Sequence, residues 1–493
     1  MQAISSDDPA YSNHQRRINE VRVIGRVVWF ARSLYYRLEK DDPSMNRRRF
    51  DSRRNRGGKL PRNAAPVELK ISHVGGRGDG VGRALYKHNH ITEEHSVFVP
   101  ATLAGEQVVA TPVAISGQGI RAVLHEIVTP SPERREPDCA AFPACGGCNF
   151  QHWRDESVTV WKHDLITSFL ARAGVPCPEI KPPHVALRHT RRRATFRLKR
   201  LAGGVAAGFL ERGSDRIIKP QDCSILDPAL ITLLSQLSEL ADSRFPIGVS
   251  IDAQANMLDN GICLLLSGPD GWHGRFPADL AGWAADHGLA RLSVAEGDGE
   301  PLTILAPAPP VIRLGTVAVT PPPGAFLQAT TDAEAALQQA VAGIVGGASR
   351  VTDLFAGCGT LCLPLLKGLS KLTAAESDNA ALAAMKAAVD AAGLGARLHC
   401  IETDLIRAPL TADLFGDVEA VIIDPPRAGA SAQCKILATT AVPTIAMVSC
   451  NPASFARDAA ILVGSGYRLT SLQIIDQFRF SSHVEIVAGL ERG

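Results

Sequence analysis

Apolar residues recur with two different periods along the 493-residue chain, and the change of period divides it. Short alternating runs at Val67–Ile71, Val97–Pro100 and Gln107–Ala110 are separated by glycine-rich turns, which is typical of short antiparallel strands. After Pro323, apolar runs of strand length alternate with Ala- and Leu-rich segments of helical length, as in βαβ units. The pattern predicts a small N-terminal β-barrel and a C-terminal doubly wound, Rossmann-like α/β domain.

Within the α/β region, individual elements follow from the same pattern. We expect strands at Val351–Phe355 and Ala420–Ile423, and helices at Leu361–Leu369 and Ala380–Ala392. The whole chain then divides into a basic arm, a barrel, a central mixed α+β domain and the doubly wound domain, at residues 1–64, 65–127, 128–320 and 321–493 respectively.

Composition changes this picture at the N-terminus. Residues 1–64 hold 15 Lys/Arg against 7 Asp/Glu and lack core periodicity, which predicts a disordered arm; a true start at Met45 is the alternative. The rest of the chain is mildly acidic, so a case for nucleic-acid binding rests on local patches. No apolar run reaches the roughly 18 residues of a membrane helix. We therefore expect a cytoplasmic protein without membrane association and without an evident obligate protein partner.

A nucleotide-like pocket is predicted where the first α/β strand ends. In Asp353-Leu-Phe-Ala-Gly-Cys-Gly-Thr360, Gly357 and Gly359 allow a ligand to approach the backbone closely. Glu376 ends the next strand, 23 positions after Asp353, where a doubly wound fold places an acid on ribose hydroxyls. The third glycine of a dinucleotide loop and the features of a phosphate loop are missing, so adenosine with a short zwitterionic tail fits best.

Further acids and one cysteine follow later strands of the same domain. Asp404 follows the third strand and Asp424 the fourth, and Cys450 ends a buried strand in Met447–Pro452. A thiolate that adds to C6 of uracil makes C5 nucleophilic, and a general base must then remove the C5 proton. His483-Val-Glu485 supplies two candidate bases, of which Glu485 is preferred.

Several motifs together resemble the RNA 5-methyluridine methyltransferase family over residues 66–493. They are Asp353–Thr360, Asp424-Pro-Pro-Arg-Ala-Gly429, Val448-Ser-Cys-Asn-Pro-Ala-Ser-Phe-Ala-Arg-Asp458 and His483–Glu485. The resemblance implies S-adenosylmethionine as the cofactor, Cys450 as nucleophile and Glu485 as base. It also implies that Gln328, Phe355, Glu376 and Asp424 contact the cofactor. To these we add Gly357 from the glycine loop and Asp404, the acid after the third strand, as further expected contacts. The run Phe478-Arg-Phe-Ser-Ser482 departs from the family pattern.

The barrel region carries a second resemblance. Gly76-x-Gly-x-Gly-Val-Gly-x-Ala84, followed by Val97-Phe-Val-Pro100, is similar to the TRAM domain, an OB-like RNA-binding barrel. The alternative is a small barrel that only packs on the rest of the protein.

Four of the eleven cysteines form a spaced set, Cys139, Cys145, Cys148 and Cys223, in the central region. Four thiolates hold either zinc or a [4Fe–4S] cluster. A single Cys-x2-Cys knuckle with two outlying cysteines favours the cluster, as does the resemblance to the same family. Cys177 and Cys263 lie outside the set.

A basic segment, Arg188–Arg200, has seven Lys/Arg in thirteen residues with Phe196 between them. As a strand it would direct alternate cations to RNA phosphates and Phe196 to a base; a solvated edge strand is the alternative.

The favoured function is methylation of C5 of a uridine in 23S rRNA. The alternatives are the same reaction on the tRNA T-loop and a non-catalytic RNA-binding or ribosome assembly factor.

Overall fold

The computed structural model describes residues 64–88, 91–116, 119–240, 246–272 and 277–493. Pro66–Thr111 and Ala122–Gly493 form one compact unit, and the described residues 64–65 and 112–121 belong to a second. The predicted arm, residues 1–64, lies outside the described residues except for Ala64. In the part of the chain that is described, no helix is both long and apolar enough to cross a membrane.

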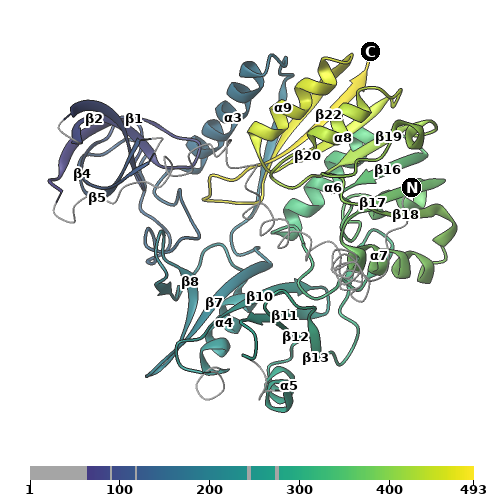
Figure 1. Cartoon of the computed structure of the whole chain (residues 1–493), viewed down its shortest axis with the longest axis horizontal. Coiled ribbons are helices and arrows are strands. Elements are labelled where there is room, and N and C mark those ends of the chain that lie inside the picture. The colour runs from purple at the N-terminus through teal and green to yellow at the C-terminus, as the bar shows by residue number, and fades with distance from the viewer. Residues whose placement is uncertain (1–63, 89–90, 117–118, 241–245, 273–276) are drawn as a thin grey trace, which may run out of the picture. The chain divides into compact units, whose positions relative to one another are not determined.

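The C-terminal domain is built on an eight-stranded sheet with the order β18-β17-β16-β19-β20-β22-β21-β6 (Figure 1). The five strands β18 to β20 in this order run parallel, and β22 is antiparallel to both neighbours. The strands are β6 (Ile180–Val185), β16 (Arg350–Leu354), β17 (Lys371–Glu376), β18 (Leu398–Glu402), β19 (Ala420–Ile423), β20 (Thr444–Ser449), β21 (Tyr467–Asp476) and β22 (Glu485–Arg492).

Both faces of this sheet are covered, which explains the continuous apolar strands. In β19, Ala420 and Ile422 pack on one face with α6 and α7, whereas Val421 and Ile423 pack on the other with α3, α8 and α9. Strands buried on both faces need apolar residues at successive positions. The helices are α3 (Asp155–Arg172), α6 (Thr331–Val345), α7 (Asn379–Ala391), α8 (Ser431–Leu437) and α9 (Pro452–Val463), with 3-10 turns η3 (Leu363–Gly368), η4 (Gly395–Arg397) and η5 (Ala412–Phe415).

The central region forms a separate seven-stranded sheet with the order β13-β12-β11-β10-β7-β8-β9, packed against two helices. Its core is mainly aliphatic and includes the aromatic side chains of Phe196, Trp272 and Phe480. The elements are β7 (Arg193–Leu201), β8 (Gly204–Leu210), β9 (Ile217–Ile218), α4 (Pro228–Leu240), β10 (Ser250–Leu258), β11 (Gly261–Gly268), α5 (Pro277–Asp286), β12 (Arg291–Glu296) and β13 (Leu302–Leu305), followed by the ribbon β14 (Ile312–Leu314) and β15 (Val317–Val319).

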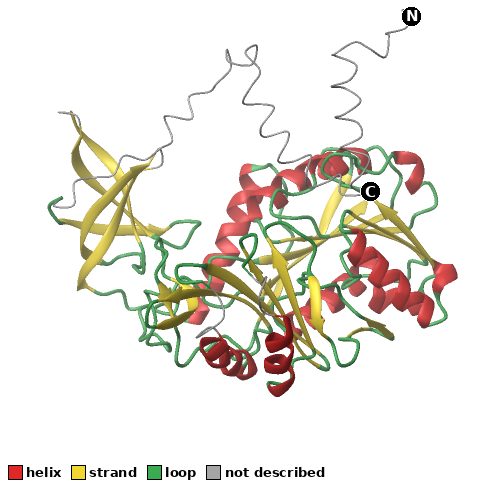
Figure 2. Cartoon of the chain, turned by 60° about the horizontal axis from the view of Figure 1, so that its bottom comes forward, coloured by secondary structure: helices red, strands yellow, loops and turns green. Residues whose placement is uncertain are grey.

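A closed five-stranded barrel with the order β1-β2-β3-β5-β4 precedes the central sheet (Figure 2, strands in yellow). Its strands are β1 (Val67–Val74), β2 (Gly80–His88), β3 (Ile91–Val99), β4 (Gln107–Ser116) and β5 (Gly119–Thr129). The three expected architectures, barrel, mixed domain and doubly wound domain, are thus confirmed.

Two details differ from the sequence predictions. The helix expected at Leu361–Leu369 is a short 3-10 turn, because Pro364 lacks the N–H that a continuous α-helix uses. The boundary expected at residue 321 is crossed by α3 and β6, since β6 pairs with β21 and α3 packs on α9. The sequence does not show that β6 belongs to this sheet, because β6 and its partner β21 are almost 300 residues apart in the chain.

Candidate active site

The carboxyl ends of four parallel strands meet at one edge of the C-terminal sheet. Phe355 follows β16, Glu376 ends β17, Asp424 follows β19 and Cys450 follows β20. Ligands of doubly wound folds bind at this edge, where loops after adjacent strands diverge. Four of the expected site residues are therefore brought to one place by topology alone.

The reversed strand β22 brings the expected base to the same edge. Because β22 runs antiparallel to β20, its first residue lies where β20 ends, with Ser449 opposite Ile486. Cys450 and Glu485 are the next positions on the two strands. The nucleophile and base expected from sequence therefore face one another although 34 residues separate them along the chain.

A pocket of about 160 Å³ opens beside this pair. Five of the six expected cofactor contacts line it: Gln328, Phe355, Gly357, Glu376 and Asp424. The sixth, Asp404, is not among its lining residues. Its carboxylate accepts the Ile406 N–H at 3.1 Å and lies 3.6 Å from Arg407, so it organises the turn after β18.

The pocket wall is acidic. Asp353, Glu376, Asp378 and Asp424 line it, and none of the described lining residues is Lys, Arg or His. Burial raises the pKa of Asp353 to about 7, with a hydrogen bond from Cys362 opposing the rise. Such a wall repels phosphates and favours a ligand with cationic groups, such as the sulfonium and ammonium of S-adenosylmethionine. In the sequence Asp353 served only as a reference position for the spacing to Glu376, and the structure shows that it forms part of the pocket wall.

The turn after β16 is held in an unusual backbone conformation. Phe355 has φ 64°, in the left-handed region that side chains rarely adopt, and Gly357 and Gly359 have φ 55° and 89°. Gly357 N–H donates to Glu376 Oε2 at 3.0 Å, so the acid of the second strand fixes the glycine loop. Strain at a non-glycine residue persists only where surrounding structure enforces it, which is common in ligand sites.

Cys450 is half-buried immediately before α9. Burial raises the pKa of its thiol to about 11, the carboxylates of Glu485 and Asp424 add to the rise, and Arg427 opposes it. Asn451 caps α9 by accepting the Ala453 N–H at 3.1 Å, so the thiol lies next to a helix N-terminus, which favours a thiolate. Burial and the two carboxylates outweigh the helix N-terminus, so the resting cysteine is protonated at neutral pH.

Glu485 is 6% exposed and its pKa is raised well above the usual value. Burial is the main cause and Asp424 adds to it, while Gln477, Arg427 and Arg193 oppose it. Burial likewise raises the pKa of Asp424 to about 7. A carboxylate with a raised pKa is a stronger base once ionised, which suits proton removal from carbon.

The other candidate base, His483, has a different environment. Arg427 donates to its Nδ1 at 2.8 Å, and burial together with nearby cations lowers its pKa. That nitrogen is therefore occupied as an acceptor, which leaves Glu485 as the carboxylate beside Cys450. Two further neighbours, Gln477 and Arg193, were not singled out from sequence because no motif marks them.

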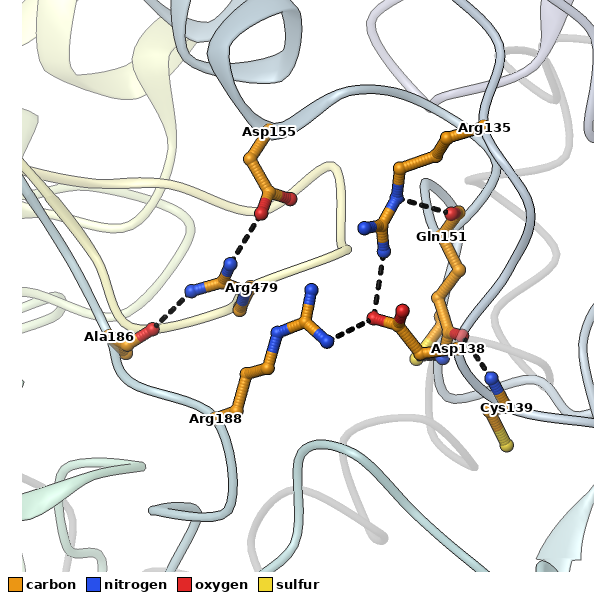
Figure 3. Close-up of polar contacts among 9 residues, drawn as sticks. Arg135, Asp138, Cys139, Gln151, Asp155, Ala186, Arg188 and Arg479 are labelled. Atoms are coloured by element: carbon orange, nitrogen blue, oxygen red, sulfur yellow. Dashed lines mark hydrogen bonds and ion pairs between the residues drawn. The ribbon is translucent and has the colours of Figure 1, made fainter.

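The loop that carries Glu485 is anchored by the residues that depart from the family pattern. Phe480 is 1% exposed, and its carbonyl accepts the N–H groups of Asn149 and Phe150 at 2.6 and 2.9 Å. Arg479 donates to Asp155 and to the Ala186 carbonyl (Figure 3). The departing residues thus tie the loop that carries Glu485 to the start of α3 and to the segment that bears the clustered cysteines.

Three arginines surround the buried Phe480 ring, with guanidinium carbons of Arg135, Arg188 and Arg479 at 5.3, 5.7 and 5.2 Å from its centroid. Arg135 and Arg188 both pair with Asp138, next to Cys139 (Figure 3). Cation–π contacts of this kind contribute about 0.5–2 kcal/mol each. The loop and the cysteine segment therefore share one set of contacts.

The four spaced cysteines line one cavity of about 750 Å³. Cys139 N–H donates to Gln151 Oε1 at 3.0 Å and Gln151 Nε2 contacts Cys148 Sγ at 3.2 Å, so one amide orients two of them. Burial raises the pKa of Cys148 to about 12, and nearby thiolates add to the rise. Among the described residues, no group of three His, Cys, Asp or Glu is drawn together tightly enough for one ion. Cys177 and Cys263 do not line the cavity.

The prediction that Phe196 stacks on a base is wrong. Its side chain is fully buried, because alternation along β7 points Ala194, Phe196 and Leu198 into the central core. Several cations of the basic segment are used within the protein: Arg188 pairs with Asp138, Arg192 with Glu334 and Arg197 with Asp252. A basic run alone did not show which cations are already paired.

Known proteins that are similar to this chain include RNA methyltransferases that act on uracil. Residues 412–492 match the family model tRNA (Uracil-5-)-methyltransferase. An uncharacterized RNA methyltransferase of Brucella suis is 37% identical, covering 86% of this chain and 98% of that protein. A 23S rRNA (uracil(1939)-C(5))-methyltransferase of Chromohalobacter salexigens is 33% identical, covering 89% and 92%.

Among solved structures, the Pyrococcus abyssi tRNA (uracil-54, C5)-methyltransferase in complex with S-adenosyl-L-homocysteine has the same fold. It superposes with a TM-score of 0.64 at 20% identity, over 86% of this chain and 99% of that one. An acid-lined pocket, a cysteine facing a buried glutamate and relatives that align over nearly their full length point to one assignment. The chain belongs to the RNA uracil-C5 methyltransferase family of S-adenosylmethionine-dependent enzymes.

Proposed function

We propose that this protein transfers the methyl group of S-adenosylmethionine to C5 of a uridine in 23S rRNA through a covalent adduct. The observation that carries the proposal is that Cys450 and Glu485 face each other at the edge of the acid-lined pocket. A fold that only bound RNA would have no need for a buried, desolvated base beside a thiol.

The steps follow from the two side chains. Cys450, after losing its proton, adds to C6 of the uracil ring, and the electrons of the C5–C6 double bond move toward C5 and O4. C5 then attacks the electrophilic methyl group of S-adenosylmethionine, the S–CH3 bond breaks, and S-adenosylhomocysteine leaves. Glu485 removes the C5 proton, the double bond re-forms and the Cys450–C6 bond breaks. One methyl group enters and one proton leaves.

Cofactor contacts are proposed for the pocket residues. Glu376 ends β17 and suits the ribose hydroxyls, whereas Asp424 and Gln328 lie toward the Cys450 side of the site. Phe355 would contact the cofactor with its ring and Gly357 with its backbone. Asp404 would contact the cofactor if the turn after β18 presented its carboxylate to the pocket.

The choice of ribosomal RNA over tRNA rests on the relatives. The Chromohalobacter protein named for uracil 1939 of 23S rRNA is 33% identical, whereas the archaeal protein named for tRNA uracil 54 shares the fold at 20%. The closed barrel, which resembles a TRAM domain, is the proposed RNA-binding module. Because C6 is inaccessible in a stacked helix, the target is an unpaired or flipped uridine.

A [4Fe–4S] cluster is the group we propose for the cysteine cavity. Cys139, Cys145, Cys148 and Cys223 all line it, and Arg191 and Arg212 also line it and interact electrostatically with the thiols. The cluster would supply four metal–sulfur crosslinks between the loop at 139–148 and the segment at Cys223. Methyl transfer needs no redox step, so its role is structural.

Anaerobically purified protein is expected to be brown and to contain about four irons per chain. Cys223→Ser should bleach it and lower the melting temperature, because the crosslink to the 139–148 loop is lost. Cys177→Ser is the matched control, since Cys177 is exposed and lies outside the cavity lining. Iron analysis and visible absorption give the answer; colourless protein with one zinc would overturn the cluster assignment.

The substrate proposal predicts that the purified protein methylates 23S rRNA from a deletion strain and leaves tRNA unmodified. Nucleoside mass spectrometry of the two RNA pools measures 5-methyluridine in each. Appearance of the product in tRNA alone would transfer the assignment to the T-loop reaction. Product in neither pool, from protein that binds S-adenosylhomocysteine, would contradict both.

A further inference from the structure

Gln477 occupies the space between the cofactor pocket and the proposed base, and no sequence motif marks it. It is the first residue after β21 and is 1% exposed. Its amide accepts the Ala329 N–H and donates to Gln328, which is next to Ala329 in the chain. It also interacts with the Glu485 carboxylate, at the start of β22, and lowers the pKa of that group. A buried amide with every polar atom engaged holds its partners in defined orientations.

The direction of these bonds follows from one backbone group. The Ala329 N–H lies 2.7 Å from Gln477 Oε1 and can only donate, so that end of the amide is the oxygen. Nε2 then faces Gln328 Oε1 at 2.7 Å and donates to it. The second Nε2 proton serves the Glu485 carboxylate, consistent with a hydrogen bond that lowers the pKa of Glu485.

The same logic decides what Gln328 offers to a ligand. Its Oε1 is taken by Gln477, so its NH2 group is the part left to contact a molecule in the pocket. The described lining residues include no Lys, Arg or His. The one anionic group of S-adenosylmethionine, its methionyl carboxylate, therefore needs a neutral donor, and the Gln328 amide is suited to that task.

We propose that Gln477 is a positioning residue that makes Gln328 a donor for the methionyl carboxylate and holds Glu485 as the base. This proposal rests on the proposed function for its second half, whereas the first half concerns cofactor binding alone. One amide thus couples the cofactor site to the proton-removing group.

The charged neighbours of Glu485 give the direction of a pH effect. Burial and Asp424 raise its pKa, and Gln477, Arg427 and Arg193 lower it. The Cys450 thiol also lies within its field. Removing the Gln477 donor raises the pKa further, so the acidic limb of the rate profile moves to higher pH.

Two substitutions separate the effects. Gln477→Met keeps the volume and removes every hydrogen bond. Gln477→Glu still accepts from Ala329 but offers no N–H when ionised, so Gln328 turns its own NH2 toward residue 477 and presents its oxygen to the ligand carboxylate. Gln433→Met is the matched control, because Gln433 is also fully buried but bonds only to the Leu410 backbone.

Calorimetric titration with S-adenosylhomocysteine needs no RNA and tests the first half. We expect affinity to fall about tenfold in Gln477→Met and about a hundredfold in Gln477→Glu, and to be unchanged in Gln433→Met. Methylthioadenosine, which lacks the methionyl carboxylate, should bind all four proteins equally. An equal loss for both ligands would overturn the proposal in favour of general disruption of the pocket.

Single-turnover rates against pH test the second half. The acidic limb should shift upward in Gln477→Met and stay in place in Gln433→Met. If Gln477→Met does not fold, Gln477→Glu, which keeps the Ala329 bond, provides both measurements. An unshifted limb with wild-type affinity would overturn the proposal. Wild-type protein inactive on RNA, with the affinity pattern as expected, would refute the proposed function while sustaining the role toward Gln328.

Discussion

Cys450→Ala is expected to reduce methyl transfer at least about 10,000-fold, which corresponds to about 5 kcal/mol of transition-state stabilisation. Without the thiolate, C5 of uracil does not become nucleophilic enough to attack the methyl group. S-adenosylhomocysteine should still bind, because Cys450 is not among the residues lining the cofactor pocket. Transfer of labelled methyl groups to rRNA and calorimetric titration measure the two properties.

Cys177→Ala is the control for loss of a thiol. Cys177 is exposed and precedes β6, whereas Cys450 lies at the carboxyl end of β20. It should retain the full rate. Robust activity in Cys450→Ala would sink the covalent mechanism. Wild-type protein that shows no transfer while it binds rRNA would instead support the non-catalytic assembly factor.

Glu485→Gln is expected to trap the covalent intermediate. The substitution keeps the shape of the buried side chain but removes the proton acceptor, so addition and methylation proceed while the C5 proton stays in place. Turnover should fall about 100- to 10,000-fold, the usual contribution of a general base. An RNA–protein species that survives a denaturing gel should accumulate and require S-adenosylmethionine.

The double variant Cys450→Ala, Glu485→Gln should form no such species, which ties the adduct to the thiol. In wild-type protein, activity should fall as pH drops through the raised pKa of Glu485, because protonation removes the base. His483→Gln should not cause the adduct to accumulate, since Arg427 already occupies Nδ1 of His483 and this side chain is not the base. Accumulation in His483→Gln alone would move the base role to that histidine.

Much of the fold was predictable because its local periods are strong. The strand at Ala420–Ile423 was placed with its observed ends, and the helix at Ala380–Ala392 was displaced by one residue. Both segments are apolar enough that burial decides their conformation. The segment at Leu361–Leu369 was harder, because leucines at helical spacing are interrupted by Pro364 and form only a short 3-10 turn.

Some residues of the candidate site were predictable from sequence motifs, and others were not. Motifs named Cys450, Glu485 and five residues that line the pocket. Strand-end positions were informative because parallel strands bring their carboxyl ends together. Asp353, Arg193 and Gln477 were not recognised as members of the site. Their importance depends on neighbours that are distant in sequence, so no local pattern marks them.

The sequence by itself therefore predicted the type of each domain, which the structure confirms, and named the candidate chemistry-bearing residues and the four-cysteine set, which remain predictions. Tertiary structure decided which groups were already engaged within the protein: Arg192 pairs with Glu334, Phe196 packs in the central core, and the Gln328 oxygen accepts from Gln477. The physical reason is that hydrophobic periodicity is a local property, whereas the pairing of a hydrogen bond or a charge depends on contacts made across more than a hundred residues of chain.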